Sequence, residues 1–464
     1  MKKGIDNIFV WTVISFIFIH FMFKIPWIPS VDVLLSLTGL IILLSSIPSL
    51  SKKTLIMPSI LIVFSLGILF ITRSSFKILW IGLQEMREII PLVILISLIN
   101  WIISYKPYVS TLTHFLQRKE KKQKTRKLIH VYSLSNIISF FSAFFMGIAS
   151  IAFVFQLFKR GEKSQINSLA WDFTLSSAIM RGFALSVFWT TINPAFAYGI
   201  AGTNAPLFST MVKGLGLSMI GLVIGLFIYL IQIKRLNVTT RFETTINNEK
   251  YDKKLLYDFF FWIGLLISLI FFLHQIANIE ILVVVPLVTL FVTLIYFTYN
   301  RDIIRYIKLW KIFTSYEMKN KQQEMTLLIS VGILVSTLKY TGIGDVLFNK
   351  YLLIIEWLKL DLLVGLTIMI LLLGFSGLPP ISAMVLLSGI IIDIPSGYSP
   401  ELITLSLLLG VSITFITGPI TMPLFIASSQ NGRSLHQNGF VWNIFFGITL
   451  LIIGQIYLQL LRLL

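Results

Sequence analysis

The sequence contains no cysteine, and this absence excludes disulfide bonds, thiolate metal sites and a cysteine nucleophile. It also lacks the HExxH, P-loop and GxSxG patterns, and its apolar stretches hold no paired carboxylates. None of its five histidines has a partner at a spacing typical of metal ligands. These absences argue against an ATP-driven pump and against an enzyme, and we expect no cofactor other than a coupling ion.

Charge is scarce as well. Only 12% of the residues are charged, 56% are hydrophobic and the mean hydropathy is +0.87, which excludes a soluble globular domain. Many apolar runs are long enough to cross a hydrocarbon core of roughly 30 Å as helices. The clear runs are residues 8–23, 31–47, 54–72, 89–104, 208–233, 255–274, 279–296, 325–338 and 440–461. With two broken spans, the sequence predicts an all-α polytopic membrane protein of about 11 spanning helices plus two hairpins.

The net charge of +18 is concentrated in short loops between the apolar runs. Basic or charge-rich loops occupy residues 52–53, 106–127, 159–163, 234–254 and 301–321. This distribution is typical of cytoplasmic loops and places the N-terminus in the cytoplasm as well. We therefore expect a multi-pass protein of a bacterial-type cytoplasmic (plasma) membrane, with the lipid bilayer as its partner and no nucleic acid.

Two apolar stretches are interrupted by hydroxyl residues and a proline. Residues 186–199 read Ser-Val-Phe-Trp-Thr-Thr-Ile-Asn-Pro-Ala-Phe-Ala-Tyr-Gly, and residues 412–423 read Ser-Ile-Thr-Phe-Ile-Thr-Gly-Pro-Ile-Thr-Met-Pro. Proline removes a backbone donor and clashes with the preceding turn, so each helix should break there. Unpaired backbone survives in a membrane only inside protein or beside a polar cavity, and paired breaks of this kind indicate a transporter's binding site.

Two further segments are predicted to be helical hairpins. Residues 133–157 are apolar but flanked by basic loops on both sides, so a hairpin with Gly147-Ile-Ala-Ser150 as its tip keeps both loops on one side. Residues 362–394 contain Gly374-Phe-Ser-Gly-Leu-Pro-Pro380, which cannot continue a helix. A bent ordinary span is the alternative for each segment.

These elements divide the chain into two similar halves. Residues 1–84 are N-terminal scaffold helices, 85–233 a first repeat, 234–254 a cytoplasmic linker, 255–321 scaffold and an interfacial helix, and 322–464 a second repeat. Each repeat holds a hairpin (133–157 or 362–394) and a broken helix (168–204 or 401–427). Each crosses the membrane an odd number of times, so the repeats should be inverted. Residues 302–316 should lie along the membrane surface as an amphipathic helix.

The hairpin tips and breaks supply the candidate binding residues. Opened backbone and hydroxyl oxygens suit a hard ion such as sodium, and half-helix N-termini suit an anion. The alternative is that each hydroxyl bonds its own helix. Arg181 lies within the same apolar helix and either attracts an anion, reaches the interface, or pairs with Asp172. The candidates for solute or ion binding are Gly147, Ser150, Arg181, Thr190, Thr191, Asn193, Pro194, Ser376, Gly377, Pro379, Ser382, Thr417, Gly418, Pro419 and Thr421.

The order of span, re-entrant hairpin and broken span, given twice, resembles the ion transporter superfamily. This group includes divalent-anion/sodium symporters, citrate transporters and arsenite permeases. The local match is the segment from Glu324 to Leu347, which is similar to that group's span ending in a small-residue turn. The tips here lack the Ser-Asn-Thr sequence of dicarboxylate symporters, so the resemblance implies the position of the site and not that substrate. It also implies a homodimer through the scaffold spans.

The sequence thus predicts a secondary active transporter of a small, anionic solute, coupled to sodium or protons and working by alternating access. Two alternatives stay open. An exporter or flippase of a lipid-linked or envelope precursor suits a site rich in phenylalanine and weakly polar. A membrane glycan polymerase needs a sizeable polar outer loop, whereas the largest loops here are predicted to be cytoplasmic.

Overall fold

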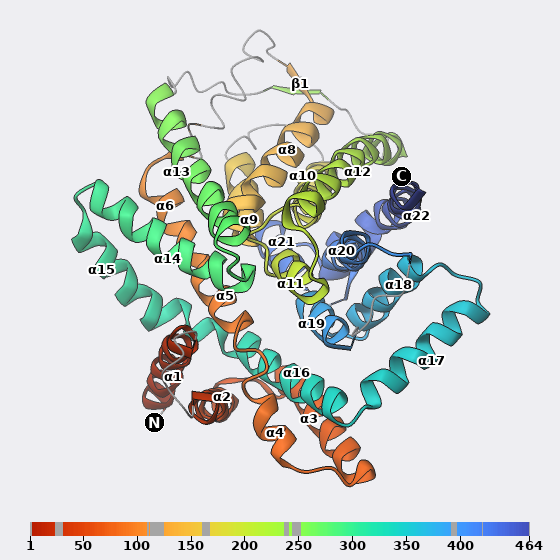
Figure 1. Ribbon diagram of the computed structural model, residues 1–464. Coiled ribbons are helices and arrows are strands. Elements are labelled where there is room, and N and C mark those ends of the chain that lie inside the picture. The colour runs from red at the N-terminus through yellow and green to blue at the C-terminus, as the bar shows by residue number, and fades with distance from the viewer. Residues whose placement is uncertain are drawn as a thin grey trace. The chain divides into compact units, whose positions relative to one another are not determined.

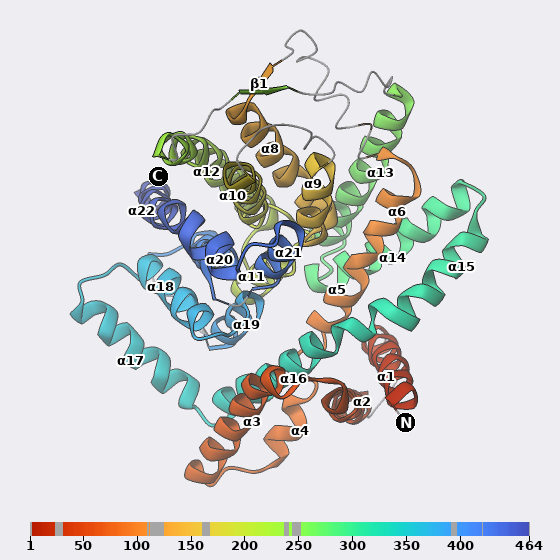
Figure 2. The same ribbon diagram turned by 180° about the vertical axis from the view of Figure 1, so that it is seen from behind.

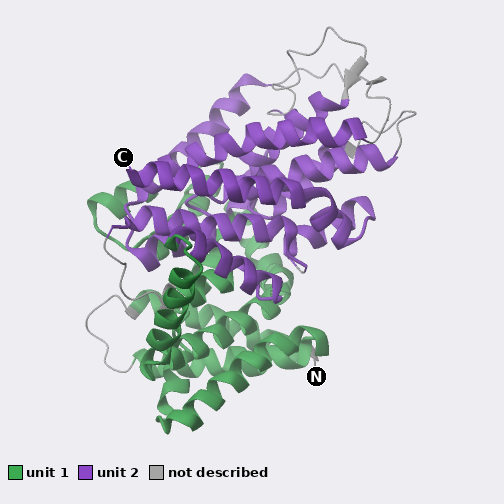
Figure 3. Cartoon of the chain, turned by 90° about the vertical axis from the view of Figure 1, so that its right-hand side faces the viewer, with its two compact units in different colours: residues 1–98, 268–362, 381–395 green, residues 99–267, 363–380, 396–464 purple. Residues whose placement is uncertain are grey.

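The computed structural model describes residues 2–23, 31–108, 111, 125–159, 168–235, 241–243, 252–390, 397–419 and 421–463. Most of the predicted cytoplasmic loops at 106–127, 159–163 and 234–254 lie outside the described residues, as do Ile420 and the second predicted hairpin after residue 390. The chain forms two compact units, coloured separately in Figure 3. Unit 1 comprises residues 1–98, 268–362 and 381–395, and unit 2 comprises residues 99–267, 363–380 and 396–464.

Unit 1 is helical throughout the residues described. Its elements are α1 (Lys2–Phe23), α2 (Val31–Ser46), η1 (Ile47–Ser49), α3 (Lys52–Thr72), α4 (Lys77–Gly82), α5 (Ile89–Leu95), η2 (Ile96–Leu98), η4 (Phe272–Ile276), α14 (Ile281–Tyr299), α15 (Ile303–Ile312), η5 (Phe313–Glu317), η6 (Lys319–Lys321), α16 (Gln322–Tyr340), α17 (Ile343–Trp357) and, apart from its first residue, α19 (Pro380–Ile390). Helix α16 packs against α2, α3 and α4 and forms the centre of this unit (Figures 1 and 2).

Unit 2 holds the hairpin and the broken helices. Its elements are α6 (Ile99–Tyr105), β1 (Thr125–Lys127), α8 (Leu128–Met146), α9 (Ala149–Lys159), α10 (Ser168–Ser186), α11 (Pro194–Thr203), α12 (Leu207–Arg235), β2 (Arg241–Glu243), α13 (Lys253–Phe271, which continues into unit 1), α18 (Leu362–Phe375), α20 (Pro400–Thr417), α21 (Met422–Asn431), η7 (Gln437–Val441) and α22 (Trp442–Leu463). Strands β1 and β2 pair antiparallel as a short ribbon.

The described helices are those of a multi-pass membrane protein. Eight are long and apolar enough to span a membrane, or nine if the bent pair formed by residues 303–340 and 343–357 is one span. The other predicted spans are residues 89–104, which form the short helices α5 to α6, and the interrupted pair α10–α11. The pair at 303–357 bends by 84° where Gly342 takes a left-handed φ of 71°. The all-α, polytopic fold class is confirmed, whereas the inverted relation of the halves stays a prediction.

The predicted interfacial segment is a helix that runs on into α16. Asp302 caps α15 through its carboxylate, which accepts a hydrogen bond from the Arg305 backbone N–H at 3.2 Å. The helix then passes through the π-turn η5 toward α16, and Tyr306 and Phe313 are buried while Ile304 and Ile307 are exposed. Its position relative to a membrane surface stays a prediction.

Candidate functional site

The first broken helix is interrupted where the sequence places its proline. Helix α10 ends at Ser186, and α11 begins at Pro194. Asn193 is the N-cap of α11, because its side-chain oxygen accepts a hydrogen bond from the Ala195 N–H at 2.9 Å. Pro194 occupies the first helical turn, where no backbone donor is needed. Residues 187–193 therefore form a turn between two half-helices.

This turn carries buried polar groups that lack a partner. The hydroxyls of Thr190 and Thr191 and the indole N–H of Trp189 are buried, and no atom in the described part of the chain hydrogen-bonds them. A buried unpaired donor or acceptor costs about 1–3 kcal/mol. Folded proteins hold few such groups, and each calls for an explanation such as a ligand or a bound water.

The tip of the first hairpin lies against this turn. Helices α8 and α9 are joined at Gly147, whose φ of 52° is left-handed and favours glycine. Phe144, in the last turn of α8, stacks on Trp189 with ring centroids 4.9 Å apart. Just past the tip, the Ser150 hydroxyl is a further buried group without a partner within the described ranges. The predicted tip residues and the first break thus belong to one neighbourhood of unit 2.

Helix α8 follows α10 closely over much of its length, and the two are side by side in both ribbon views (Figures 1 and 2). A Cβ atom on Gly182 would lie 2.4 Å from the Asn136 carbonyl oxygen, so only glycine allows this approach. The Ser139 hydroxyl donates to the Ile179 carbonyl at 2.7 Å. Close packing fixes the hairpin relative to the first broken helix.

The second broken helix has different hydroxyl chemistry. Helix α20 ends at Thr417, and α21 begins at Met422 after Gly418 and Pro419. The Thr417 hydroxyl donates to the Ile413 carbonyl at 2.7 Å, and the Thr421 hydroxyl donates to the Phe415 carbonyl at 2.9 Å. The Thr417 hydroxyl thus bonds its own helix, which is the alternative that sequence reasoning left open for any single hydroxyl, and the Thr421 hydroxyl bonds back across the break to the end of α20.

The two broken helices cross one another near their interruptions. Helix α20 contacts α10 and α11, and α10 also contacts α21. The Ser412 hydroxyl donates to the Ala184 carbonyl at 2.8 Å, and Thr203 and Thr404 share a hydrogen bond of 2.6 Å. Helix α21 also packs against α9 of the hairpin. The structure thus brings three predicted parts of the site together: the first tip and both breaks.

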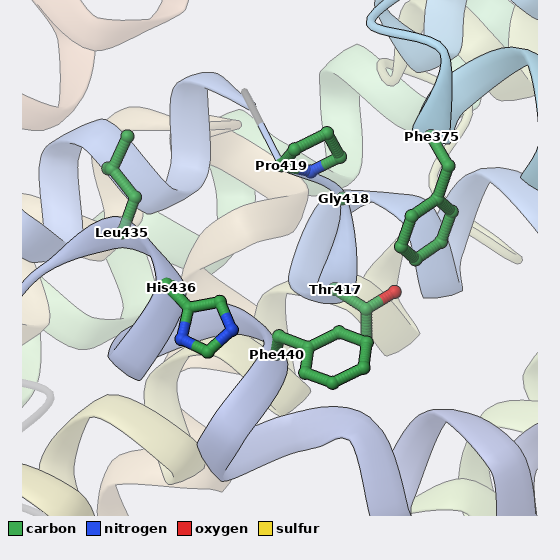
Figure 4. Close-up of a pocket in the computed structure, with 7 residues that line it drawn as sticks. All are labelled: Phe375, Thr417, Gly418, Pro419, Leu435, His436 and Phe440. Atoms are coloured by element: carbon green, nitrogen blue, oxygen red, sulfur yellow. The ribbon is translucent and has the colours of Figure 1, made fainter.

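A pocket of about 300 Å³ opens beside the second break (Figure 4). Its lining residues are Phe375, Thr417, Gly418, Pro419, Leu435, His436 and Phe440. This volume lies at the lower end of the range of small-molecule sites. The His436 and Phe440 rings stack with centroids 5.6 Å apart. The walls are mostly apolar, with one hydroxyl and one imidazole.

Arg181 is fully buried and makes five hydrogen bonds, as many as a guanidinium can donate. Its acceptors, at 2.8–3.3 Å, are all neutral: the Tyr132 hydroxyl, the Gly225 carbonyl, the Gln232 side chain, the Trp442 carbonyl and the Asn443 side chain. Asp172 is paired instead with Arg433 at 2.7 Å. The suggested Arg181–Asp172 pair is therefore wrong, and the charge of Arg181 lacks a carboxylate partner among the residues described. The suggested reach of Arg181 to the interface stays a prediction.

A polar network continues from Arg181 toward the connection between α21 and α22. Asn443 donates to the Asn438 carbonyl at 2.8 Å, and Asn438 accepts from the Ser176 hydroxyl and from Asn431, both at 2.7 Å. The π-turn η7 turns Asn438 and Gly439 inward, and π-turns in helices are frequent at functional sites. This network ties α10 to the segment that lines the pocket.

The remaining predicted residues lie in the connection between α18 and α19 and at the start of α19, and the arrangement of these two helices as a hairpin stays a prediction. Gly377 has a left-handed φ of 100°, and the Ser376 hydroxyl donates to the Leu373 carbonyl at 2.7 Å. Pro379 is half-buried in the same turn. Ser382 is buried in α19 and belongs to unit 1, whereas the other candidates belong to unit 2.

Sequence reasoning missed Trp189 and the pocket residues His436, Phe440, Leu435 and Phe375. Trp189 stands directly before the Thr-Thr pair, and this adjacency was the available signal. The connection from α21 to α22 reads Gly-Arg-Ser-Leu-His-Gln-Asn-Gly over residues 432–439, which looks like an ordinary polar loop. Its approach to the second break depends on tertiary packing and left no local signal.

No protein-family model matches the chain, and no curated protein sequence matches it. The chain is similar to solved structures of membrane transporters, among them the following two. The YdaH transporter of Alcanivorax borkumensis aligns over 80% of this chain and 84% of its own, with 15% identity and a TM-score of 0.50. MtrF of Neisseria gonorrhoeae, from a class of antimetabolite efflux pumps, aligns over 79% of each chain with 14% identity and a TM-score of 0.46. At such identity the first likeness shows the fold alone: this chain shares its fold with a solved membrane transporter.

Proposed function

We propose that this protein is a secondary active transporter of a small anionic solute, coupled to sodium or to protons. The observation that carries the proposal is the contact of two interrupted helices beside a hairpin tip, where the hydroxyls of Thr190, Thr191 and Ser150 are buried without a partner among the described residues. Broken helices at matching places in two halves of a membrane protein are typical of transporter binding sites. We also propose membership of the ion transporter superfamily, on the same order of elements.

The anionic character of the solute follows from charge. The described interior of unit 2 holds the Arg181 guanidinium among neutral acceptors, while Asp172 is neutralised by Arg433 and Glu401 by Lys213. Because charges interact more strongly away from water, an uncompensated buried cation favours a bound anion over a bound cation. Arg181 acts through its field here, since its donors are already used.

The coupling ion is proposed to be sodium in the first place, and protons in the second. A proton carrier of the usual kind needs a buried Asp or Glu, and the described carboxylates of the site region are paired with Arg433 and Lys213. Hydroxyl and carbonyl oxygens at helix breaks suit a hard cation. Sodium would then bind together with the anion, because the anion offsets the positive field of Arg181.

An exporter or flippase for an amphiphilic precursor is the second candidate. One observation favours it: the pocket beside Gly418 is walled largely by Phe375, Phe440, Leu435 and Pro419. Phe375 and Phe440 are each 42% exposed, so the pocket opens at the surface of unit 2. An apolar, open pocket accepts the hydrophobic portion of a larger solute. A location in the plasma membrane with a cytoplasmic N-terminus, and a homodimer, are proposed with either function.

Flux into proteoliposomes tests both candidates. Labelled organic anions are offered under an inward sodium gradient, a matched choline gradient and a proton gradient. We expect accumulation of at least one anion that requires sodium, and its loss in Thr190→Val/Thr191→Val. Lys339→Leu, an exposed site in unit 1, is the matched control and should transport like the unchanged protein. Accumulation no better than in protein-free liposomes would overturn transport, and equal uptake under all gradients would overturn coupling.

The exporter or flippase candidate is tested in the same proteoliposomes. A fluorescent short-chain anionic lipid placed in one leaflet reports translocation when a reductant bleaches only the outer leaflet. Translocation of the lipid without uptake of any small anion favours the exporter and contradicts the first candidate. Uptake of small anions without lipid translocation does the reverse.

A further inference from the structure

We propose that the turn between α10 and α11 is an oxyanion site, in which the indole N–H of Trp189 and the hydroxyls of Thr190 and Thr191 donate to a carboxylate or similar group of the solute. This inference rests on the proposed function and names the group that the site recognises. Three consecutive residues present buried polar atoms without a partner in the portion of the chain that the structure describes.

Trp189 indicates whether the ligand bound at this turn is an anion or a cation. A hydroxyl can donate or accept, so Thr190 and Thr191 alone fit either a cation or an anion. An indole N–H only donates, and sodium has no lone pair to accept it. A carboxylate offers about four acceptor positions, enough for all three donors of the turn. The donor set therefore fits an oxyanion, and a sodium ion must find its oxygens elsewhere.

The indole is held in place by the hairpin. Its ring stacks on Phe144 at 4.9 Å and contacts Phe140 at 5.4 Å between ring centroids. Both phenylalanines belong to α8, which Gly182 and Ser139 fix against α10. A donor whose ring is packed against two other rings loses little freedom when an acceptor arrives, which is the condition for a specific site.

Two electrostatic effects on a bound anion oppose one another at this turn. The C-terminal end of α10 carries partial negative charge, which opposes an anion. Part of that charge is answered locally, because the Ser186 carbonyl accepts from the backbone N–H groups of Trp189 and Thr190. The guanidinium of Arg181, on the same helix and five residues before its end, has a full positive charge and neutral acceptors. This positive charge favours an anion, in opposition to the roughly half negative charge of the helix end.

The second break lacks this capacity. Thr417 and Thr421 donate their hydroxyl protons to the Ile413 and Phe415 carbonyls. They would have to give up those bonds to reach an anion. Oxyanion recognition therefore belongs to the first break, and the pocket at the second break is left for the apolar part of the solute.

Binding to the purified full-length protein tests the inference. The probes are benzoate, succinate and sulfate as N-methylglucamine salts and as sodium salts, compared with chloride at equal ionic strength. The readout is the shift in the unfolding midpoint with probe concentration. We expect at least one oxyanion to stabilise the unchanged protein and Trp189→Phe to weaken it by about 10-fold or more, since that change keeps the ring and removes one charge-assisted bond.

Trp171→Phe is the matched control, because it changes a different tryptophan, which is buried in α10 and lies away from the turn. It should leave the affinity unchanged. Equal affinity in Trp189→Phe and the unchanged protein would overturn the inference while leaving anion transport intact. Failure of all three oxyanions to bind would overturn it too, and the flux experiment then decides separately whether transport stands.

A second variant covers the case in which Trp189→Phe does not fold. Thr190→Val keeps the shape of the side chain and removes its hydroxyl, and it should weaken the same oxyanion by several-fold. In a preparation with ¹⁵N-labelled tryptophan, the Trp189 indole resonance should move on addition of the oxyanion and not on addition of sodium chloride. A resonance that moves only with sodium contradicts the assignment.

Discussion

The two broken helices share a pattern of threonine and proline but use it differently. In the first, the Thr190 and Thr191 hydroxyls have no partner among the described residues, and Asn193 caps the second half-helix. In the second, Thr417 and Thr421 donate to carbonyls of α20, and an apolar pocket opens beside this break. The comparison teaches that a repeated sequence pattern need not repeat the chemistry. One break leaves its hydroxyls without a partner within the described residues, and the other uses its hydroxyls to bond the end of α20.

The first half-helices of the two breaks, α10 and α20, also differ in the charged residues that they bury. Helix α10 buries Arg181 in its interior, whereas the only charged residue of α20 is Glu401 in its first turn. Glu401 is bonded to Lys213 and Ser209, so it contributes little net charge. The proposal therefore assigns recognition of a charged group to the first half, and the apolar part of the solute to the second half.

The largest effect is expected from removing the charge of the first helix. Arg181→Leu leaves five acceptors on α8, α12 and α22 without their donor. A buried polar group left without its hydrogen-bond partner costs about 1–3 kcal/mol, and five are left here, so the variant should accumulate poorly or unfold many degrees lower. Thermal unfolding in detergent measures this. Lys339→Leu, at an exposed position, should change the stability by no more than about 0.5 kcal/mol.

An Arg181→Leu protein with an unchanged unfolding midpoint would show that the five bonds add nothing to the fold. The claim that a buried charge distinguishes α10 from α20 in its effect on the protein would then be wrong. Arg181→Lys separates charge from geometry, because lysine keeps the charge but cannot reproduce the planar set of donors. We expect the unfolding midpoint of Arg181→Lys to lie between those of Arg181→Leu and the unchanged protein.

The next effect concerns the second break. In Gly418→Ala, the new methyl group would lie 2.7 Å from the Thr414 carbonyl oxygen and 3.1 Å from the Thr421 Cγ2 atom. The backbone φ of −62° is allowed for alanine, so the cost is steric, about 1–3 kcal/mol, and the pocket wall must move. Gly67→Ala, within α3 and with no atom nearby, should instead stabilise by up to about 1 kcal/mol. Opposite shifts in unfolding midpoint are expected, and a shift of the same sign contradicts the steric account.

A smaller effect should distinguish how the two second half-helices begin. Asn193→Ala removes a side-chain cap worth about 1 kcal/mol, and the first turn of α11 should fray. Thr421 makes no side-chain cap bond to α21, so Thr421→Ala should leave the amides of that helix as protected as before. Hydrogen exchange read by mass spectrometry compares the two segments. Equal loss of protection in α11 and α21 would show that the two breaks are capped alike.

Much of the fold could be predicted because membrane helices follow from local sequence. Long apolar runs mark spans, and Pro194, Pro419 and the glycines at 147 and 377 mark interruptions that backbone chemistry alone dictates. The bend at Gly342 follows from the same kind of signal. These features need no knowledge of which helices touch.

The chemistry of the site was less accessible for the opposite reason. The pairing of Asp172 with Arg433 joins residues 261 apart in sequence, so Arg181 looked like the nearer partner. The state of each hydroxyl depends on whether a carbonyl happens to lie within reach, which separates Thr190 from Thr417 although their sequence settings are alike. Trp189 gains its meaning only through its contact with Phe144. Such facts are properties of packing.

The smallest effect is the most direct test of the comparison, because it predicts opposite signs at like residues. Thr417→Val removes a made hydrogen bond and should destabilise by roughly 1 kcal/mol. Thr190→Val removes a buried hydroxyl that has no partner within the described residues, so without ligand it should be neutral or slightly stabilising. Unfolding midpoints in ligand-free detergent show whether each variant is stabilised or destabilised.

If both variants are destabilised alike, the Thr190 hydroxyl is paired, by water or by protein, and the first break is no more open than the second. If the Thr190 hydroxyl is free, an added oxyanion should raise the unfolding midpoint of Thr417→Val, which keeps this hydroxyl, more than that of Thr190→Val, which lacks it. The order of the two midpoints should then reverse, because a ligand stabilises most the protein that can donate to it.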